Sequence, residues 1–392
     1  MAVAATAPDI LGHKIADMML TAGELDDFRR SLQESGSQIV VERSDTGIVS
    51  LRAQGSHAPQ WKTAVEDFYK SARQINLLLN TALMSLVSSC EWFFSNLQHQ
   101  YYATHPSAIS SKDKSLSLDD LKGFDSIEDA RNHLIETRIE GVVRGPFDEW
   151  IRVLREAPFK LSLGYLDPVL PALIEVFQRR NLFVHNGGVV NSIFLRKVAP
   201  ELRREISAGD VLTNTREYLD RAIDLLQAHF SLIAAEMWKQ FAPKDENRAE
   251  LLTALVLESL KKNRWRVAEP LSDFLTRDRQ LTEASTTVAR VNHWQTLKWQ
   301  GRYEEIRNDV ENVDFSAKDA IYRLALLAIK SDVTGFFELL PVVLASGRVT
   351  AHDLEDWPIF REVRSDERFQ TAVLELKAKQ ATTIQPSPLR PE

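Results

Sequence analysis

The residues best suited to chemistry lie in one short stretch, 179–188, which reads RRNLFVHNGG. Arginine presents a fixed fork of donors to phosphoryl oxygens, and histidine exchanges protons near neutral pH. Arg180 could therefore hold a phosphate while His185 acts as a general acid or base. Asn181 precedes the histidine by four residues, so it shares a helical face with it and could orient the imidazole. Residues of these types suit the cleavage of a phosphodiester bond.

Three further residues could support this site. Gln178 lies on the helical face of Asn181 and His185, Arg179 adds a second guanidinium, and Glu91 is a candidate partner for the motif. A structural interpretation stays open beside the catalytic one. Basic residues in a last helical turn interact favourably with the helix dipole, and a following glycine is an ordinary helix end. The stretch could then serve only to terminate a helix, with Glu91 as a structural acid.

The spacing of Arg180, Asn181 and His185 resembles the signature of the HEPN superfamily, an arginine followed after four to six residues by a histidine. The segment 86–94, LVSSCEWFF, looks like the first bundle helix of many members, which carries an acid among bulky apolar residues. The resemblance covers roughly residues 62–241. It implies a helical bundle with metal-independent endoribonuclease activity, as in toxin–antitoxin, abortive-infection and CRISPR effector systems. A second match, Arg52 to His57, lacks the polar residue and falls in a predicted loop.

Five residues at about 100° each separate Arg180 from His185 by roughly 140° around a helix, so one copy does not aim both at the same atom. The resemblance implies a homodimer in which the motifs of two protomers meet at a shared cleft, with RNA as the substrate and no cofactor or metal. The family subtype with a modified tyrosine two residues after the histidine is not supported, because that position is Gly187.

Apolar spacing predicts the helices that would position this site. A long helix is expected from Trp61 to Tyr102, with apolar residues such as Ile75 forming its buried stripe. A second is expected from Pro168 to Asn186, capped by Asp167 and ended by Gly187 and Gly188. A third is expected over 214–241, and Ser117 and Ser126, each with an acid three residues on, predict two further helix starts. Residues 59–241 therefore read as one all-α bundle.

The two ends of the chain differ from this bundle. Residues 1–58 predict a small segment with a helix over 16–34 and a β-hairpin of 39–41 with 48–51. Residues 242–380 resemble degenerate tetratricopeptide repeats, a solenoid-like region in which Trp294, Trp299 and Trp357 would be core, although two packed helical hairpins would explain the pattern as well. The prolines of 381–392 predict a disordered tail. The helices expected in the repeat region cover 250–263, 283–300, 303–313, 317–331, 333–345 and 353–376.

Composition limits the classes of function. The 392 residues carry a net charge of −7 with 44% apolar content, which argues against a polycation that coats nucleic acid. Between 141 and 204, however, ten basic residues face six acidic ones, a local sum of +4. The single cysteine, Cys90, allows neither an internal disulfide nor a cysteine zinc cluster. Polar residues interrupt the apolar stretch 75–97, so we expect a buried helix, no membrane span, no signal peptide and a cytoplasmic protein.

Other catalytic patterns are missing from the sequence, which has no phosphate-binding loop and no GxSxG elbow. His99 and His105 have no acids at metal-ligand spacing and are expected to be surface residues at a helix end. Two function classes remain. One is a HEPN-type ribonuclease acting as a bacterial toxin or antiphage-defence effector, with a C-terminal region that binds a protein regulator or antitoxin. The other is a noncatalytic scaffold in which the bundle only dimerises and the repeats bind a protein.

Overall fold

The computed structural model describes residues 13–19, 39–43, 48–53, 58–108, 116–245 and 247–383. Its first part is an antiparallel sheet with strand order β1-β3-β2, formed by β1 (His13–Met19), β2 (Ile39–Arg43) and β3 (Ile48–Ala53). β2 and β3 pair as the predicted hairpin. The helix predicted over 16–34 is wrong at its start, because residues 16–19 belong to β1, whose backbone pairs with β3. The rest of that predicted helix lies outside the described residues, as do the predicted loop around His57 and residues 384–392.

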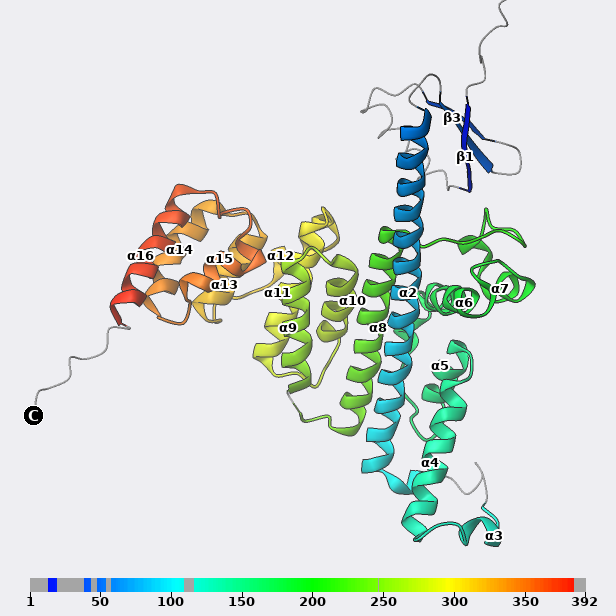
Figure 1. Ribbon diagram of the computed structural model, residues 1–392. Coiled ribbons are helices and arrows are strands. Elements are labelled where there is room, and N and C mark those ends of the chain that lie inside the picture. Colours follow the sequence, from blue (N-terminus) through cyan, green and yellow to red (C-terminus); the bar gives the residue numbers. More distant parts are fainter. Residues whose placement is uncertain are drawn as a thin grey trace, which may run out of the picture.

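One long helix, α2 (Ala58–Thr104), forms the axis of the molecule. It runs beside α8 (Arg216–Phe241), and the shorter helices α4 to α7 lie on the opposite side from the C-terminal helices (Figure 1). The predicted helix over 61–102 is therefore confirmed and extended at both ends. The bounds of the shorter helices on that side are α3 (Leu118–Leu121), α4 (Ile127–Val143), α5 (Phe147–Arg155), α6 (Leu170–Asn186) and α7 (Ser192–Lys197).

The bundle core lies between α2, α4, α5, α6 and α8. The Phe94 and Trp150 rings stack with centroids 4.5 Å apart, and both side chains are fully buried. Ser117 and Ser126 cap α3 and α4, as predicted: each side-chain oxygen accepts a hydrogen bond from the backbone N–H three residues on. Apolar burial across five helices holds α6, the helix of the candidate site, against α2.

The N-terminal half of α2 departs from the predicted burial. Ile75, placed in the buried stripe, is 56% exposed, and its neighbours Leu77 and Leu78 are also exposed. The stretch Gln74–Thr104 is the one helix among the described residues that is long and apolar enough to cross a membrane, which is weak evidence because core helices pass the same test. Buried Leu83 and side-by-side packing with α4, α6 and α8 are features of a bundle helix.

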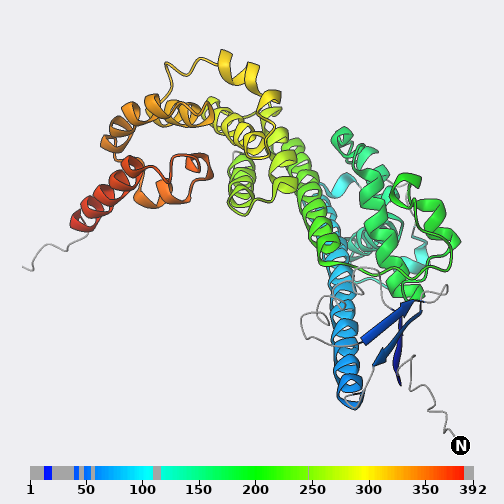
Figure 2. The ribbon, with the colours of Figure 1, turned by 90° about the horizontal axis from the view of Figure 1, so that it is seen from above.

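Helix α8 belongs to two cores at once. Phe230 and Ile233 face the bundle, whereas Ala228 and Leu232 pack against the helices that follow. Those helices curve away from α8 as an arm (Figure 2). Their bounds are α9 (Asn247–Lys261), α10 (Trp265–Thr276), α11 (Glu283–Trp299), α12 (Arg307–Asn312), α13 (Ala320–Ile329), α14 (Val333–Ala345), α15 (Ala351–Asp356) and α16 (Glu367–Thr383).

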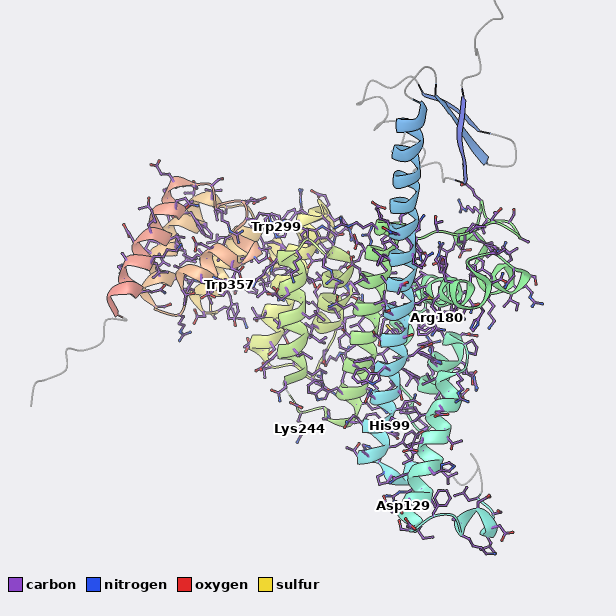
Figure 3. The ribbon with its side chains drawn as sticks, viewed as in Figure 1. His99, Asp129, Arg180, Lys244, Trp299 and Trp357 are labelled. Carbon is purple, nitrogen blue, oxygen red and sulfur yellow. The ribbon has the colours of Figure 1, made fainter. Side chains whose placement is uncertain are left out.

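The arm differs from the expected pattern at three places. Helix α10 was not predicted, and it contains Pro270, a residue type that usually ends helices. The single helix expected over 353–376 is divided into α15, a 3₁₀ turn at Pro358–Phe360 and α16. Trp294 is buried as expected, whereas Trp299 and Trp357, labelled in Figure 3, are only half-buried. Helix α16 runs to Thr383, three residues into the expected tail.

Candidate functional site

The candidate site lies in the last two turns of α6, whose end has a defined cause. Gly187 adopts a left-handed conformation with φ 56°, and its N–H and that of Gly188 both donate to the carbonyl of Leu182. The predicted glycine exit is thus confirmed. The predicted cap at the other end is wrong: Asp167 ends a 3₁₀ turn and pairs with Arg155, and Val169 is the residue before α6.

Arg180 connects α6 to α2. Its guanidinium forms an ion pair with Glu91 and donates a second hydrogen bond to the Asn181 side-chain oxygen at 3.0 Å. The pair is sheltered, since the side chains of Arg180 and Glu91 are 16% and 26% exposed. Figure 3 places Arg180 beside the middle of α2. The structure therefore brings together three of the residues proposed from the sequence, and it holds the arginine in one orientation before any ligand binds.

Arg179 points into a different network. It pairs with Glu175 at 2.7 Å, lies 4.1 Å above the ring of Tyr218, and donates to the Thr213 carbonyl at 3.3 Å. The Tyr218 hydroxyl donates to the other Glu175 oxygen at 2.6 Å. Burial, reinforced by the Glu175 charge, raises the pKa of Tyr218 well above its ordinary value. Arg179 thus ties α6 to α8, a connection that the sequence pattern did not indicate because Tyr218 lies 43 residues beyond Glu175.

Gln178, Asn181 and His185 lie along one face of α6 as their spacing requires. Exposure rises along this face: Gln178 is buried, Asn181 half-buried and His185 exposed. Within the part of the chain that the structure describes, His185 makes no hydrogen bond or ion pair. Its ring is therefore accessible to a ligand, and nothing within this single copy brings it onto Arg180.

Cys90 precedes the site acid but is not a candidate nucleophile. It is buried on α2, and this burial, together with the neighbouring Glu91 charge, raises the pKa of the thiol to about 12. The thiol therefore stays protonated at neutral pH and behaves as an apolar core group.

The positive charge predicted between 141 and 204 is distributed unevenly. Five of its ten basic residues are already in ion pairs: Arg144, Arg152, Arg155, Arg179 and Arg180. Arg196, Lys197 and Arg204 are exposed and have no acidic partner among the described residues. They lie on or shortly after α7, which packs against α6. Lys160, which follows α5, is exposed and also has no acidic partner among the described residues. Three of these four exposed, unpaired basic residues therefore lie on the α7 side of the candidate site.

The remaining histidines near the bundle do not extend the site. His99 is exposed on α2 (Figure 3), and His105 stacks on Tyr101 with centroids 5.0 Å apart. Across the described ranges, no group of three or more His, Cys, Asp or Glu residues could hold a metal ion.

Comparison with known proteins gives no relative from which to transfer a role. No protein-family model matches the chain, and no match was found among curated proteins or solved structures. The chemistry of the site is therefore argued from its own residues.

Proposed function

We propose that this chain is a metal-independent RNA endonuclease of HEPN type, a cytoplasmic toxin or antiphage-defence effector. The observation that carries the proposal is the orientation of Arg180 together with the exposure of His185. Arg180 is oriented by Glu91 across the α2–α6 contact, and His185, five residues later, is exposed with no partner among the described residues. An oriented cation and an accessible imidazole are the two groups that cleavage of a phosphodiester by proton transfer requires, and two copies of the chain would bring them to one phosphate.

In this mechanism each residue has a separate role. His185 takes the proton from the 2′-hydroxyl or gives one to the leaving 5′-oxygen, because an imidazole can act either as a base or as an acid in such a transfer. Arg180 donates to the phosphoryl oxygens and stabilises the charge that develops there. Asn181 lies between the two in sequence and contacts Arg180, so it positions the arginine or the scissile group.

The active unit is a homodimer. Within one chain Arg180 faces Glu91 while His185 points to solvent, so a second copy has to bring the other half of the motif to the cleft. Trp92 follows Glu91 and is 70% exposed, so a large apolar side chain lies at the surface beside the site, where the second copy would bind. RNA would reach the cleft along the basic surface of Arg196, Lys197 and Arg204, where the phosphate backbone supplies most of the attraction.

The C-terminal arm would bind a protein regulator or antitoxin. Successive helices α9, α10, α11, α13 and α14 pack neighbour on neighbour, an arrangement consistent with tetratricopeptide-like repeats. Because α8 is shared by the arm and the bundle, a partner bound to the arm can act on the bundle through one rigid helix.

A noncatalytic scaffold is the second candidate, and one observation favours it. Glu91 and Asn181 already engage two of the nitrogens of the Arg180 guanidinium, which is the expected state of a structural arginine. In that case the bundle would only dimerise and the arm would bind a protein.

Expression in bacteria separates the two candidates. Wild-type protein should arrest growth, and His185→Ala should not. His99→Ala, which removes another exposed histidine from the same bundle, is the matched control and should arrest growth like the wild type. Equal growth of cells expressing wild type and His185→Ala, at equal protein levels, would contradict the nuclease and favour the scaffold.

A further inference from the structure

A cleft lies where the arm joins the bundle, away from Arg180 and His185. It has a volume of about 560 Å³, within the range of small-molecule sites, and it lies between α8, α10 and α11. A second hollow of about 330 Å³ continues it, because His229, Pro270, Asp273 and Arg277 line both. Many side chains in the wall are titratable, which is unusual for a gap between packed helices.

Two imidazoles in this cleft present acceptors. His229 is buried and its Nδ1–H donates to the Leu225 carbonyl at 2.7 Å, which leaves Nε2 as an acceptor. The Ser272 hydroxyl donates to the Glu269 carbonyl, so the 3.2 Å contact with His293 Nδ1 runs from the imidazole to the hydroxyl and again leaves Nε2 as an acceptor. Burial lowers the pKa of both histidines, which keeps them neutral at pH 7.

The wall of the cleft holds three arginines, Arg266, Arg277 and Arg302, and three acids, Glu269, Asp273 and Glu305. Arg302 is held by Glu269 and Glu305, whereas the other two arginines are free or weakly held. Arg266 is exposed and has no ion pair among the described residues, although Glu269 lies one turn away, because Glu269 is engaged by Arg302 at 2.8 Å. Arg277 has a surface pair with Asp273 in which its side chain is 75% exposed, and such pairs are easily exchanged for a ligand. In the adjoining hollow, Lys239 reaches its acids only at 3.9 Å.

Tyr165 lines the smaller hollow with a side chain whose hydroxyl is closed off from solvent and has no hydrogen-bond partner among the described residues. That hydroxyl is not counted among the groups that a ligand would contact. The wall offers exposed guanidinium groups for an anionic group, and two neutral imidazoles for hydroxyl or amino donors.

We propose that this cleft binds a small phosphate ester bearing hydroxyl groups, a sugar phosphate or a nucleotide, with its phosphate on Arg266 and Arg277 and its hydroxyl groups on His229 and His293. A dianion suits a site with more than one available cation, and the guanidinium fork fits phosphate oxygens. Val169, the residue before α6, also lines the cleft, so the ligand would contact the start of the helix that carries Arg180. This proposal does not depend on whether the protein cleaves RNA.

Calorimetric titration of the full-length protein tests it with three probes: AMP, ribose 5-phosphate and inorganic phosphate. We expect one ester to bind with 1:1 stoichiometry at micromolar to submillimolar Kd, at least tenfold tighter than inorganic phosphate. Tighter binding of AMP than of ribose 5-phosphate would indicate a nucleotide, and equal binding a sugar phosphate. Failure of both esters to bind below about 5 mM, or binding of inorganic phosphate as tight as either ester, would overturn the proposal.

Variants locate the site. Arg266→Ala should weaken binding of the ester at least tenfold, whereas Arg279→Ala, which removes an exposed arginine shortly after α10 that does not line the cleft, should leave it unchanged. His293→Phe keeps an aromatic ring but removes the hydrogen-bond acceptor. It should therefore weaken binding of the ester and leave binding of inorganic phosphate unchanged. Unchanged ester binding by a folded Arg266→Ala protein, judged by circular dichroism, would place the ligand elsewhere and refute the assignment.

Discussion

Glu91 of α2 holds Arg180 of α6, so the arginine of the candidate site is oriented by a residue 89 positions earlier in the chain. The two side chains are mostly sheltered from water, which makes the ion pair stronger than one on an open surface. This contact fixes the spacing of the two helices at the point where the proposed chemistry takes place.

Replacement of Glu91 by glutamine should lower stability and alter the site together. The amide keeps the size of the side chain but loses the charge, and we expect a loss of about 1–2 kcal/mol in the free energy of unfolding. RNA cleavage should fall at least tenfold because Arg180 is no longer fixed. Urea unfolding and single-turnover cleavage measure the two effects, and a variant with unchanged stability would show that the pair does not exist in solution.

The two glycines after α6 should respond differently to alanine. A Cβ on Gly187 would meet nothing within 4 Å, so only its left-handed backbone opposes the substitution, at about 1 kcal/mol. A Cβ on Gly188 would lie 2.9 Å from the Phe183 ring and 3.0 Å from the Leu212 carbonyl, and we expect about 2–4 kcal/mol. Denaturant unfolding of both variants provides the comparison. Equal losses in the free energy of unfolding would mean that the turn after α6 has a different backbone conformation.

The arm should depend on one buried ion pair. Arg248 and Asp278 meet at 2.7 Å with side chains 2% and 0% exposed. Asp278→Ala leaves the arginine buried without its partner and should cost about 3–5 kcal/mol, and the double variant Arg248→Met/Asp278→Leu should recover most of this loss. Glu304→Ala breaks an exposed pair with Arg307 and should cost under about 1 kcal/mol. Thermal unfolding measures these losses. Equal losses of stability for Asp278→Ala and Glu304→Ala would show that the Arg248–Asp278 ion pair is not buried in solution.

Cys90 should be unreactive in the folded protein. With a thiol pKa of about 12, only about one molecule in 10⁴ carries the thiolate at pH 8, and burial blocks access as well. Reaction with a disulfide reagent should be slow at pH 8, should quicken as pH rises toward 12, and should reach one equivalent after unfolding, because the chain has a single cysteine. Rapid stoichiometric reaction of native protein would show that this part of α2 is open.

The helices predicted best are those whose bounds depend on residues within or next to the helix itself, such as apolar spacing and a glycine at the end. Helix α14 has the predicted bounds, Val333–Ala345, and α6 ends at the predicted glycines. The failures arise where tertiary packing overrides a local rule. Pro270 argues against a helix, yet α10 forms around it because Val267 and Leu271 are fully buried against neighbouring helices. Residues 16–19 pair with β3, and that choice depends on a strand more than 25 residues away.

The candidate site was predictable only in part. The place of Gln178, Asn181 and His185 on one helical face follows from their spacing. The rise in exposure from Gln178 to His185 does not, because it depends on which helices cover the start of that face. The contacts of Arg179 with Glu175 and Tyr218 could not be predicted from the spacing, because they depend on where α8 lies. The cleft at the junction of arm and bundle was also beyond the sequence, since its wall gathers residues from 169 to 305.

Cleavage of RNA by purified protein in EDTA tests the central proposal most directly. Wild-type protein should produce fragments that end in 2′,3′-cyclic phosphate, and His185→Ala should reduce the rate by at least 10²-fold, the size expected for loss of a general acid or base. His99→Ala should retain the wild-type rate. Absence of cleavage by the wild type, or equal rates for wild type and His185→Ala, would contradict the assignment of Arg180 and His185 to a nuclease site.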